Sequence, residues 1–311
     1  MRRSGVGLAL VTATAAAVVL HVAPSAQQPV FRADVNATPL YVAVRDRDDN
    51  AVMGLTAADF DVRVDGRPAG IVSFSNEPQP FAAVILVDFS ASMSTHRAAV
   101  REATTAFIDR LLPGDRVRLG GFSNRIVLAP DTFTGERDAL LDALKFQVGR
   151  VDAGGSSPVW RAATESLDAL RAQPLRRVLI MLSDGHDTPG RGQGGATAEE
   201  VIRQARADEA LVHALGFVIR RWGSTAYDPV RIHGPNPRLE TLARRSGGRY
   251  IEIDRSPDFT GIFTRLIDEL HSQYLVGVSV EDRDGRRHDL DVRVRRDGMR
   301  VRAPDSFVAQ R

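Results

Sequence analysis

The segment that most constrains the fold is residues 81–93, an unbroken apolar stretch that ends in polar side chains, FAAVILVDFSASM. Because the apolar residues are continuous rather than alternating, they predict a strand buried on both faces, as in a parallel sheet covered by helices. Asp88 ends the stretch, and Ser90 and Ser92 follow at every second position. Open α/β sheets hold their ligands at the carboxyl ends of such strands. Three hard oxygen donors at that place favour a divalent cation such as Mg²⁺ over zinc or copper.

The same polar residues carry a resemblance to a known family. Asp88, Ser90 and Ser92 resemble the D-x-S-x-S signature of the metal-ion-dependent adhesion site of von Willebrand factor A domains. The resemblance implies a metal held by hydroxyls and, partly through water, by aspartates. It also implies one open coordination position for an acidic group of a protein partner.

Strand and helix patterns alternate from residue 81 onward. The predicted strands span residues 81–88, 115–122, 125–128, 178–182, 211–219 and 250–253, and the predicted helices span residues 95–112, 137–146, 159–170, 198–207, 239–245 and 258–274. Such alternation predicts an α/β fold with a doubly wound, mainly parallel sheet.

Both ends of the chain have a different pattern, with apolar and charged residues alternating at a period of two, as in Leu40–Val44 and Leu290–Val294. This pattern predicts antiparallel strands with one wet face. We expect a segment at residues 31–76 and the strands within residues 257–308 to pair in a small β-sandwich-like domain. The α/β domain, residues 81–256, would be inserted between them. The alternative is two separate small sheets.

Two further loops offer oxygen ligands for the predicted cation. The run GGSSP precedes a helix and resembles the family's G-G-T segment, with Ser156 on the threonine position and Ser157 one residue away. The apolar strand VLIML leads into Asp184, which resembles the family's second aspartate. The predicted metal ligands are therefore Asp88, Ser90, Ser92, Ser156 and Asp184, holding Mg²⁺, with Mn²⁺ or Ca²⁺ as alternatives. The competing interpretation is that the serines cap helices and that Asp184 belongs to an ordinary turn.

The resemblance extends beyond the A domain. The segments FRADV at 31–35, GLTAADF at 54–60, GRY at 248–250 and SQYLVG at 272–277 resemble exported "VWFA-related" proteins common in Acidobacteria. The chain departs from the pattern at Ala91, where glycine is usual, and at Trp160, where an acidic residue is frequent. Because the function of that family is poorly defined, the likeness names an architecture.

Four residues near the predicted site are candidate partner contacts: Ser157, His186, Trp222 and Tyr227. For His186 the alternative is a solvent-facing loop residue, and the two aromatic residues could instead pack their loop. A G-x-G-x-x-G run at residues 190–195 is not interpreted as a nucleotide site, because a dinucleotide fold places that loop immediately after its strand.

The amino-terminal segment indicates export. Residues 1–26 have a basic start, an apolar run and small residues before Gln27, which is the outline of a signal peptide. An uncleaved membrane anchor is the alternative. Cysteine is absent and the net charge is +2, so neither disulfides nor nucleic-acid binding is expected. We expect a bacterial protein secreted to the periplasm or the medium.

The sequence thus predicts a secreted, metal-dependent protein-binding module for adhesion, not an enzyme. One alternative is a metal-assisted hydrolase that uses Asp88 or Asp184 as a base on bound water. The sequence supplies no separate nucleophile and no histidine pair for that chemistry. The other alternative is a structural envelope protein in which the metal braces the loops.

Overall fold

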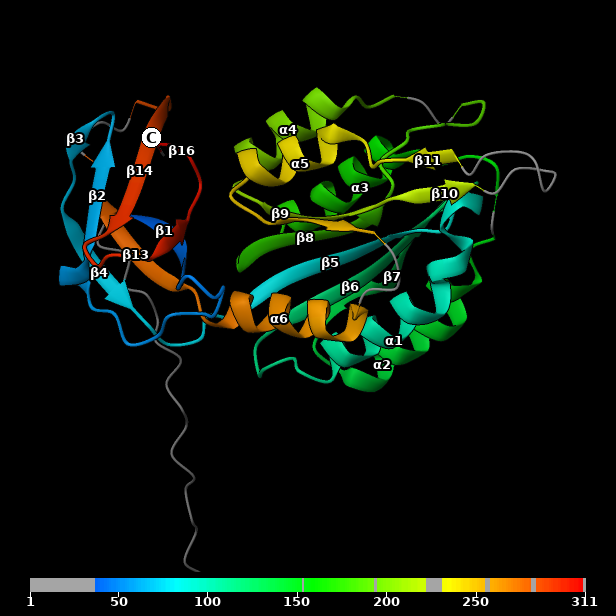
Figure 1. Ribbon diagram of the computed structural model, residues 1–311, viewed down its shortest axis with the longest axis horizontal. Coiled ribbons are helices and arrows are strands. Elements are labelled where there is room, and N and C mark those ends of the chain that lie inside the picture. Colours follow the sequence, from blue (N-terminus) through cyan, green and yellow to red (C-terminus); the bar gives the residue numbers. More distant parts are fainter. Residues whose placement is uncertain are drawn as a thin grey trace, which may run out of the picture. The chain divides into compact units, whose positions relative to one another are not determined.

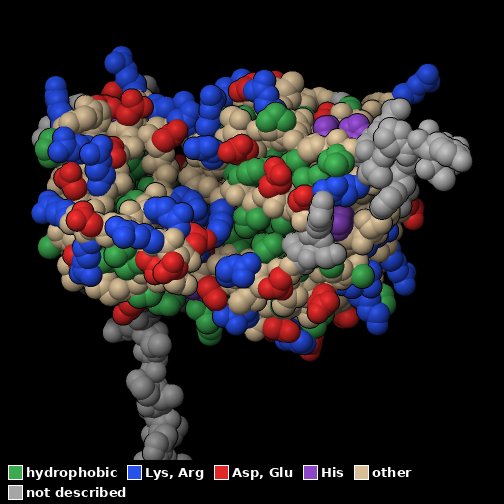
Figure 2. Space-filling view, in the orientation of Figure 1, with side chains coloured by type: hydrophobic (Ala, Val, Ile, Leu, Met, Phe, Trp, Pro, Cys, Tyr) green, Lys and Arg blue, Asp and Glu red, His purple; other side chains and the backbone are tan. Residues whose placement is uncertain are grey.

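Figure 1 shows the structure, a computed structural model that describes residues 37–152, 154–192, 195–221, 231–254, 258–280 and 284–309. The predicted signal peptide lies outside these residues. Within them, every helix is too short or too polar to cross a lipid bilayer. Acidic and basic side chains are interspersed on the face shown in Figure 2.

The central sheet follows the prediction from the apolar runs. Its strands are β5 (Phe81–Asp88), β6 (Arg116–Phe122), β7 (Ile126–Thr134), β8 (Arg176–Ser183), β9 (Leu211–Phe217) and β12 (Tyr250–Ile253). They lie in the order β12-β9-β8-β5-β6-β7. All pairs are parallel except β6 with β7, which is antiparallel. Because β5 is central, all of its residues are buried.

Helices cover both faces of this sheet (Figure 1). One face carries α1 (Arg97–Ile108), α2 (Arg137–Asp142) and α6 (Phe259–His271), and the other carries α3 (Val159–Arg171), α4 (Ala198–Ala207) and α5 (Pro237–Arg245). Each face has its own apolar core, to which alternate residues of β5 contribute. This is the predicted doubly wound α/β architecture.

Strands from both ends of the chain build the β-rich part. One sheet has the order β15-β1-β13-β4 and the other the order β16-β14-β2-β3. The strands are β1 (Ala37–Arg45), β2 (Phe60–Val64), β3 (Arg67–Pro68), β4 (Ile71–Ser75), β13 (Tyr274–Ser279), β14 (Arg287–Val294), β15 (Arg300–Arg302) and β16 (Ser306–Val308). Each sheet mixes the two chain ends, so the predicted pairing of the termini is confirmed and separate sheets are excluded.

Shorter elements complete the chain. A hairpin of β10 (Ile219–Arg221) and β11 (Arg231–His233) follows β9. Short 3₁₀ helices span Ala57–Asp59, Ala91–His96 and Val148–Arg150, and a π-helical turn spans Ala143–Gln147.

One difference from the sequence prediction lies at the last helix, which was expected to reach residue 274. It ends at His271, and Tyr274 begins β13. The Tyr274 hydroxyl accepts from the amide of Leu55 at 3.1 Å and donates to the carbonyl of Val52 at 2.7 Å. Pairing with a distant strand therefore makes Tyr274, which continues the helical pattern locally, the first residue of a strand.

Candidate metal centre

Asp88 lies at the carboxyl end of β5 and is 1% exposed. Its Oδ1 accepts from the amide of Ser90 at 2.8 Å. Its Oδ2 accepts from the hydroxyls of Ser157 at 3.1 Å and Ser183 at 2.7 Å. The central strand thus presents a carboxylate on which two loops and the end of the neighbouring strand β8 converge.

A second group of oxygens lies in the same cluster. The hydroxyls of Ser90 and Ser92 are 3.0 Å apart, and Ser92 donates to Asp184 Oδ2 at 2.7 Å. Asp184 directly follows β8 and is 5% exposed, and its Oδ1 accepts from the amide of His186 at 3.0 Å. The structure therefore brings Asp88, Ser90, Ser92 and Asp184 together, as the sequence predicted.

Ser156 lies differently from its prediction. Its hydroxyl donates to Asn124 Oδ1 at 2.9 Å, while the neighbouring Ser157 reaches Asp88. The reason is local geometry, because Ser157 forms a β-bridge with Thr188. Successive side chains of an extended segment point to opposite sides. Between the two serines that the sequence left open, Ser157 is the one whose hydroxyl joins the cluster.

The electrostatics of the cluster are unusual. Burial raises the pKa of the Asp88 carboxyl, hydrogen bonds from Ser183 and Ser90 oppose the shift, and the nearby Asp184 carboxylate adds to it. Within the described residues, neither aspartate forms an ion pair with an arginine, lysine or histidine side chain. A buried carboxylate without a cationic partner is costly. The described part of the chain therefore supplies no positive charge to offset the two carboxylates of the cluster.

The chemistry of the donors fits a hard divalent cation. Asp88, Ser90, Ser92, Ser157 and Asp184 offer carboxylate and hydroxyl oxygens, which Mg²⁺, Mn²⁺ and Ca²⁺ accept. Among the described residues, no group of three or more His, Cys, Asp or Glu side chains is placed to hold a metal. A cation at this place would therefore depend on the serine hydroxyls together with the two aspartates.

The remaining predicted contacts are placed only in part. His186 is exposed, and its Nε2 lies 3.1 Å from the carbonyl oxygen of Gly234. Trp222 and Tyr227 lie outside the described residues, as do two residues of the glycine-rich run at 190–195.

Sequence reasoning missed the role of Ser183. This residue is fully buried, donates to Asp88 and accepts from the amide of Gly185 at 2.8 Å. The available signal was its position as the last residue of an apolar strand that pairs with the strand of Asp88. A polar side chain buried at such a position requires a hydrogen-bond partner, and the adjacent strand end supplies one.

The comparisons with known proteins agree with this architecture. The chain belongs to the von Willebrand factor type A domain family, whose model matches residues 82–251. Domains of this family generally bind protein ligands rather than catalyse reactions, and they often hold divalent cations. None of the curated proteins compared with the sequence matches it. The narrower resemblance to exported Acidobacterial proteins stays a prediction.

Several solved structures are similar to this chain at low sequence identity. A von Willebrand factor type A protein from Catenulispora acidiphila is 14% identical, with 90% of this chain and 76% of that chain covered and a TM-score of 0.50. BatB from Bacteroides thetaiotaomicron is 16% identical, with 61% and 98% covered and a TM-score of 0.46. The pilus adhesin SpaC from Lactobacillus rhamnosus GG is 13% identical, with 83% and 42% covered and a TM-score of 0.47. The likeness to the Catenulispora acidiphila protein shows the fold alone, and no argument rests on the other two.

Proposed function

We propose that this protein is an exported binding module in which a divalent cation captures an acidic side chain of a protein partner. The observation that carries the proposal is the buried cluster around Asp88 and Asp184. Two aspartates and four serine hydroxyls, contributed by segments that are separate in the sequence, share one hydrogen-bonded group in which no described side chain is cationic.

The residues have distinct tasks in this proposal. Asp88 and Asp184 supply the negative charge that attracts the ion, and the hydroxyls of Ser90, Ser92 and Ser157 supply neutral oxygen ligands. Mg²⁺ prefers six oxygen ligands and keeps some water. When bound, the cation would act as an electrophile for a carboxylate. Because the hydroxyl ligands carry no charge, much of the ion's positive charge would be left for the partner.

Export is part of the proposal and rests on residues 1–26, whose composition is that of a signal peptide. An exported binding module would meet its partner in the periplasm or the medium. Mass spectrometry of the mature amino terminus from the producing cell would test this point, because an intact residue 1 in the membrane fraction would contradict soluble export.

The two neighbouring serines give a matched test of the metal site. In Mn²⁺ titrations, Ser157→Ala is expected to weaken affinity by about tenfold or more, because one oxygen ligand is lost. Ser156→Ala is expected to leave the affinity within about threefold, because that hydroxyl faces Asn124. A double Ser90→Ala/Ser92→Ala variant should lose binding. Equal losses for Ser156→Ala and Ser157→Ala would overturn the assigned ligand set.

A second experiment separates binding from catalysis and from a bracing metal. Envelope proteins would be captured by immobilised protein with Mg²⁺, with EDTA, and with the double serine variant. The proposal predicts capture that EDTA and the variant both abolish. Capture without any cation would leave a structural role, and metal-dependent turnover of phosphoesters or peptides would favour a hydrolase.

A further inference from the structure

A second unbalanced charge borders a cavity at the opposite end of the central sheet. The cavity has a volume of about 160 Å³. It is formed by the amino ends of β8 and β9, the carboxyl ends of α4 and α5, and residues of β1 and β16. Asp88 ends β5 and Asp184 follows β8, so the candidate metal centre lies at the carboxyl ends of these strands and this cavity is separate from it.

Arg176 is the charged residue of this cavity that is most deeply buried, with 5% of its surface exposed. Its guanidinium donates to the Gln273 side chain and, at 2.7 Å, to the carbonyl of Leu270. Both partners are neutral. Its Nε is buried and has no hydrogen-bond partner in the structure. A buried guanidinium without a carboxylate partner is as costly as a buried carboxylate without a cation.

The carboxylates nearby do not supply the missing partner. Asp115 acts on Arg176 through its charge. Its oxygens, however, accept from the amides of Phe81 at 3.2 Å and Leu112 at 2.8 Å and contact His271 Nε2 at 2.8 Å. Glu209 borders the cavity, and burial raises the pKa of its carboxyl. Among the described residues, Glu209 is the one carboxyl side chain that lines the cavity, and burial opposes its charged form.

Apart from Ser246 and Ser306, the other side chains around the cavity are basic or apolar. Arg177, Arg206 and Arg245 add to its positive charge, although Arg206 is paired with Asp305 at 2.9 Å. The apolar walls include Tyr41 and Phe307. The Tyr41 ring lies 4.8 Å from the guanidinium carbon of Arg176. The site therefore combines a positive end with aromatic walls.

We propose that this cavity binds a small carboxylate with an apolar body of about the size of a benzene ring. The carboxylate would lie against Arg176, whose planar guanidinium suits that geometry. The apolar body would lie among the walls that include Tyr41 and Phe307. The size follows from the volume, since a cavity of about 150 Å³ is known to accept benzene. The walls come from β1 and β16 of the β-rich part and from the α/β part, which belong to one compact unit. Such a ligand would therefore contact both the β-rich part and the α/β part.

The test uses the whole mature chain in EDTA, so that its outcome is independent of the candidate metal centre. Calorimetric titrations with benzoate, benzamide and acetate distinguish charge from apolar contact. We expect saturable binding of benzoate, at least about tenfold tighter than that of either other compound. Benzoate should also shift the amide resonances of Tyr41 and Phe307. Absence of saturable benzoate binding up to about 10 mM, or equal affinity for benzamide or acetate, would overturn the proposal.

A pair of variants places the site. Arg176→Met is expected to weaken benzoate binding by about tenfold or more, and Arg118→Met is the matched control, because Arg118 lies outside the cavity and also donates to backbone carbonyls. Unchanged affinity in Arg176→Met would contradict the assignment. If Arg176→Met does not fold, as judged by circular dichroism, the ligand comparison and the resonance shifts in the unmodified protein decide whether benzoate binds in this cavity.

Discussion

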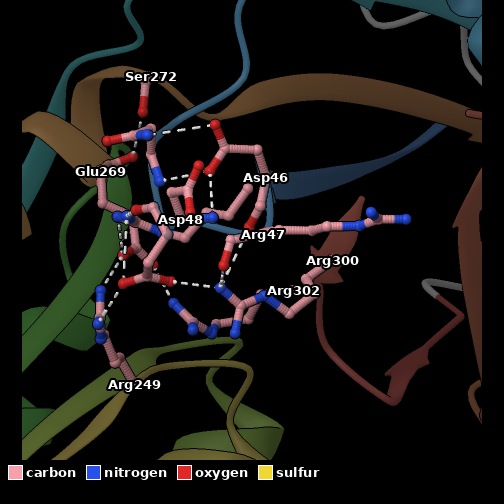
Figure 3. Close-up of polar contacts among 11 residues, drawn as sticks. Asp46, Arg47, Asp48, Arg249, Glu269, Ser272, Arg300 and Arg302 are labelled. Carbon is pink, nitrogen blue, oxygen red and sulfur yellow. Dashed lines mark hydrogen bonds and ion pairs between the residues drawn. The ribbon is translucent and has the colours of Figure 1, made fainter. Parts of the chain in front are cut away.

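Asp88 and Glu269 are both buried carboxylates, each 1% exposed, yet their surroundings are opposite. Glu269, on α6, is held by arginines of three segments (Figure 3). It accepts from Arg45 at 2.5 Å, from Arg249 at 3.3 Å and from Arg302. Burial alone would raise the pKa of Glu269, but Arg302, His213, Arg45 and Arg249 together hold it at about 2. Asp88 is bonded by serines, and its pKa is raised.

The difference separates a structural carboxylate from a candidate functional one. Around Glu269 the chain supplies its own cations, and they come from β1, from β15 and from the segment before β12. Around Asp88 it supplies neutral hydroxyls. The first cluster is balanced by the chain's own arginines, whereas the second would be balanced by the cation of the proposed function.

Removal of the Glu269 charge should have the largest effect. Glu269→Gln leaves several arginines without their anion and is expected to reduce the free energy of unfolding by about 3–5 kcal/mol. Urea denaturation measures it. The control is Glu240→Gln in the exposed pair with Arg244, for which about 0.5 kcal/mol or less is expected. A small change in the free energy of unfolding for Glu269→Gln would mean that the charges around Glu269, like those around Asp88, are not balanced.

Acid should act on Glu269 with a defined sign. Its pKa is about 2 in the folded protein against 4.5 for the free group, so the unfolded chain binds the extra proton. The stabilisation is present above pH 4.5 and is lost as the pH falls toward 2, by about 3 kcal/mol at about 1.4 kcal/mol per pKa unit. Urea denaturation between these pH values measures the loss. Glu269→Gln should lack this part of the acid dependence. If the variant loses stability with falling pH in the same way as the unmodified protein, Glu269 is not the group responsible.

The smallest effect, and the one of opposite sign, is expected at Asp88. In EDTA, Asp88→Asn removes an unbalanced buried charge and should increase the free energy of unfolding by about 1 kcal/mol. Mg²⁺ at about 100 times its dissociation constant should stabilise the unmodified protein by about 2.7 kcal/mol and the variant not at all. Thermal and urea unfolding with and without Mg²⁺ test both statements. Destabilisation of Asp88→Asn in EDTA would remove the contrast with Glu269.

Much of the fold could be predicted because its elements are marked locally. The continuous apolar run at β5 identified a central parallel strand, and the limits of α4 and β12 were predicted to the residue. The end of α6 was predicted wrongly, because the helical pattern continues locally into Tyr274. The strand conformation of Tyr274 is set by pairing with Val42, which is distant in sequence.

The candidate site was predictable in its residue types and less so in its geometry. Asp88, Ser90 and Ser92 are adjacent in the sequence, so their grouping follows from one motif. The choice between Ser156 and Ser157 depends on a bridge to Thr188, which belongs to another loop. The partners of Glu269 lie in separate segments of the chain, and no local pattern indicates them.

The position of β13 between β1 and β4 has a consequence for biosynthesis. Ala37 pairs with Ser279, so the first strand of this sheet emerges long before the strand that separates it from β4. Until then, β1 and β4 each present open backbone edges of the kind that promote aggregation. A chain that stops before Tyr274 would retain these edges permanently. This sheet can therefore assemble only after β13 has been synthesised, and its assembly depends on keeping β1 and β4 from other pairings until then.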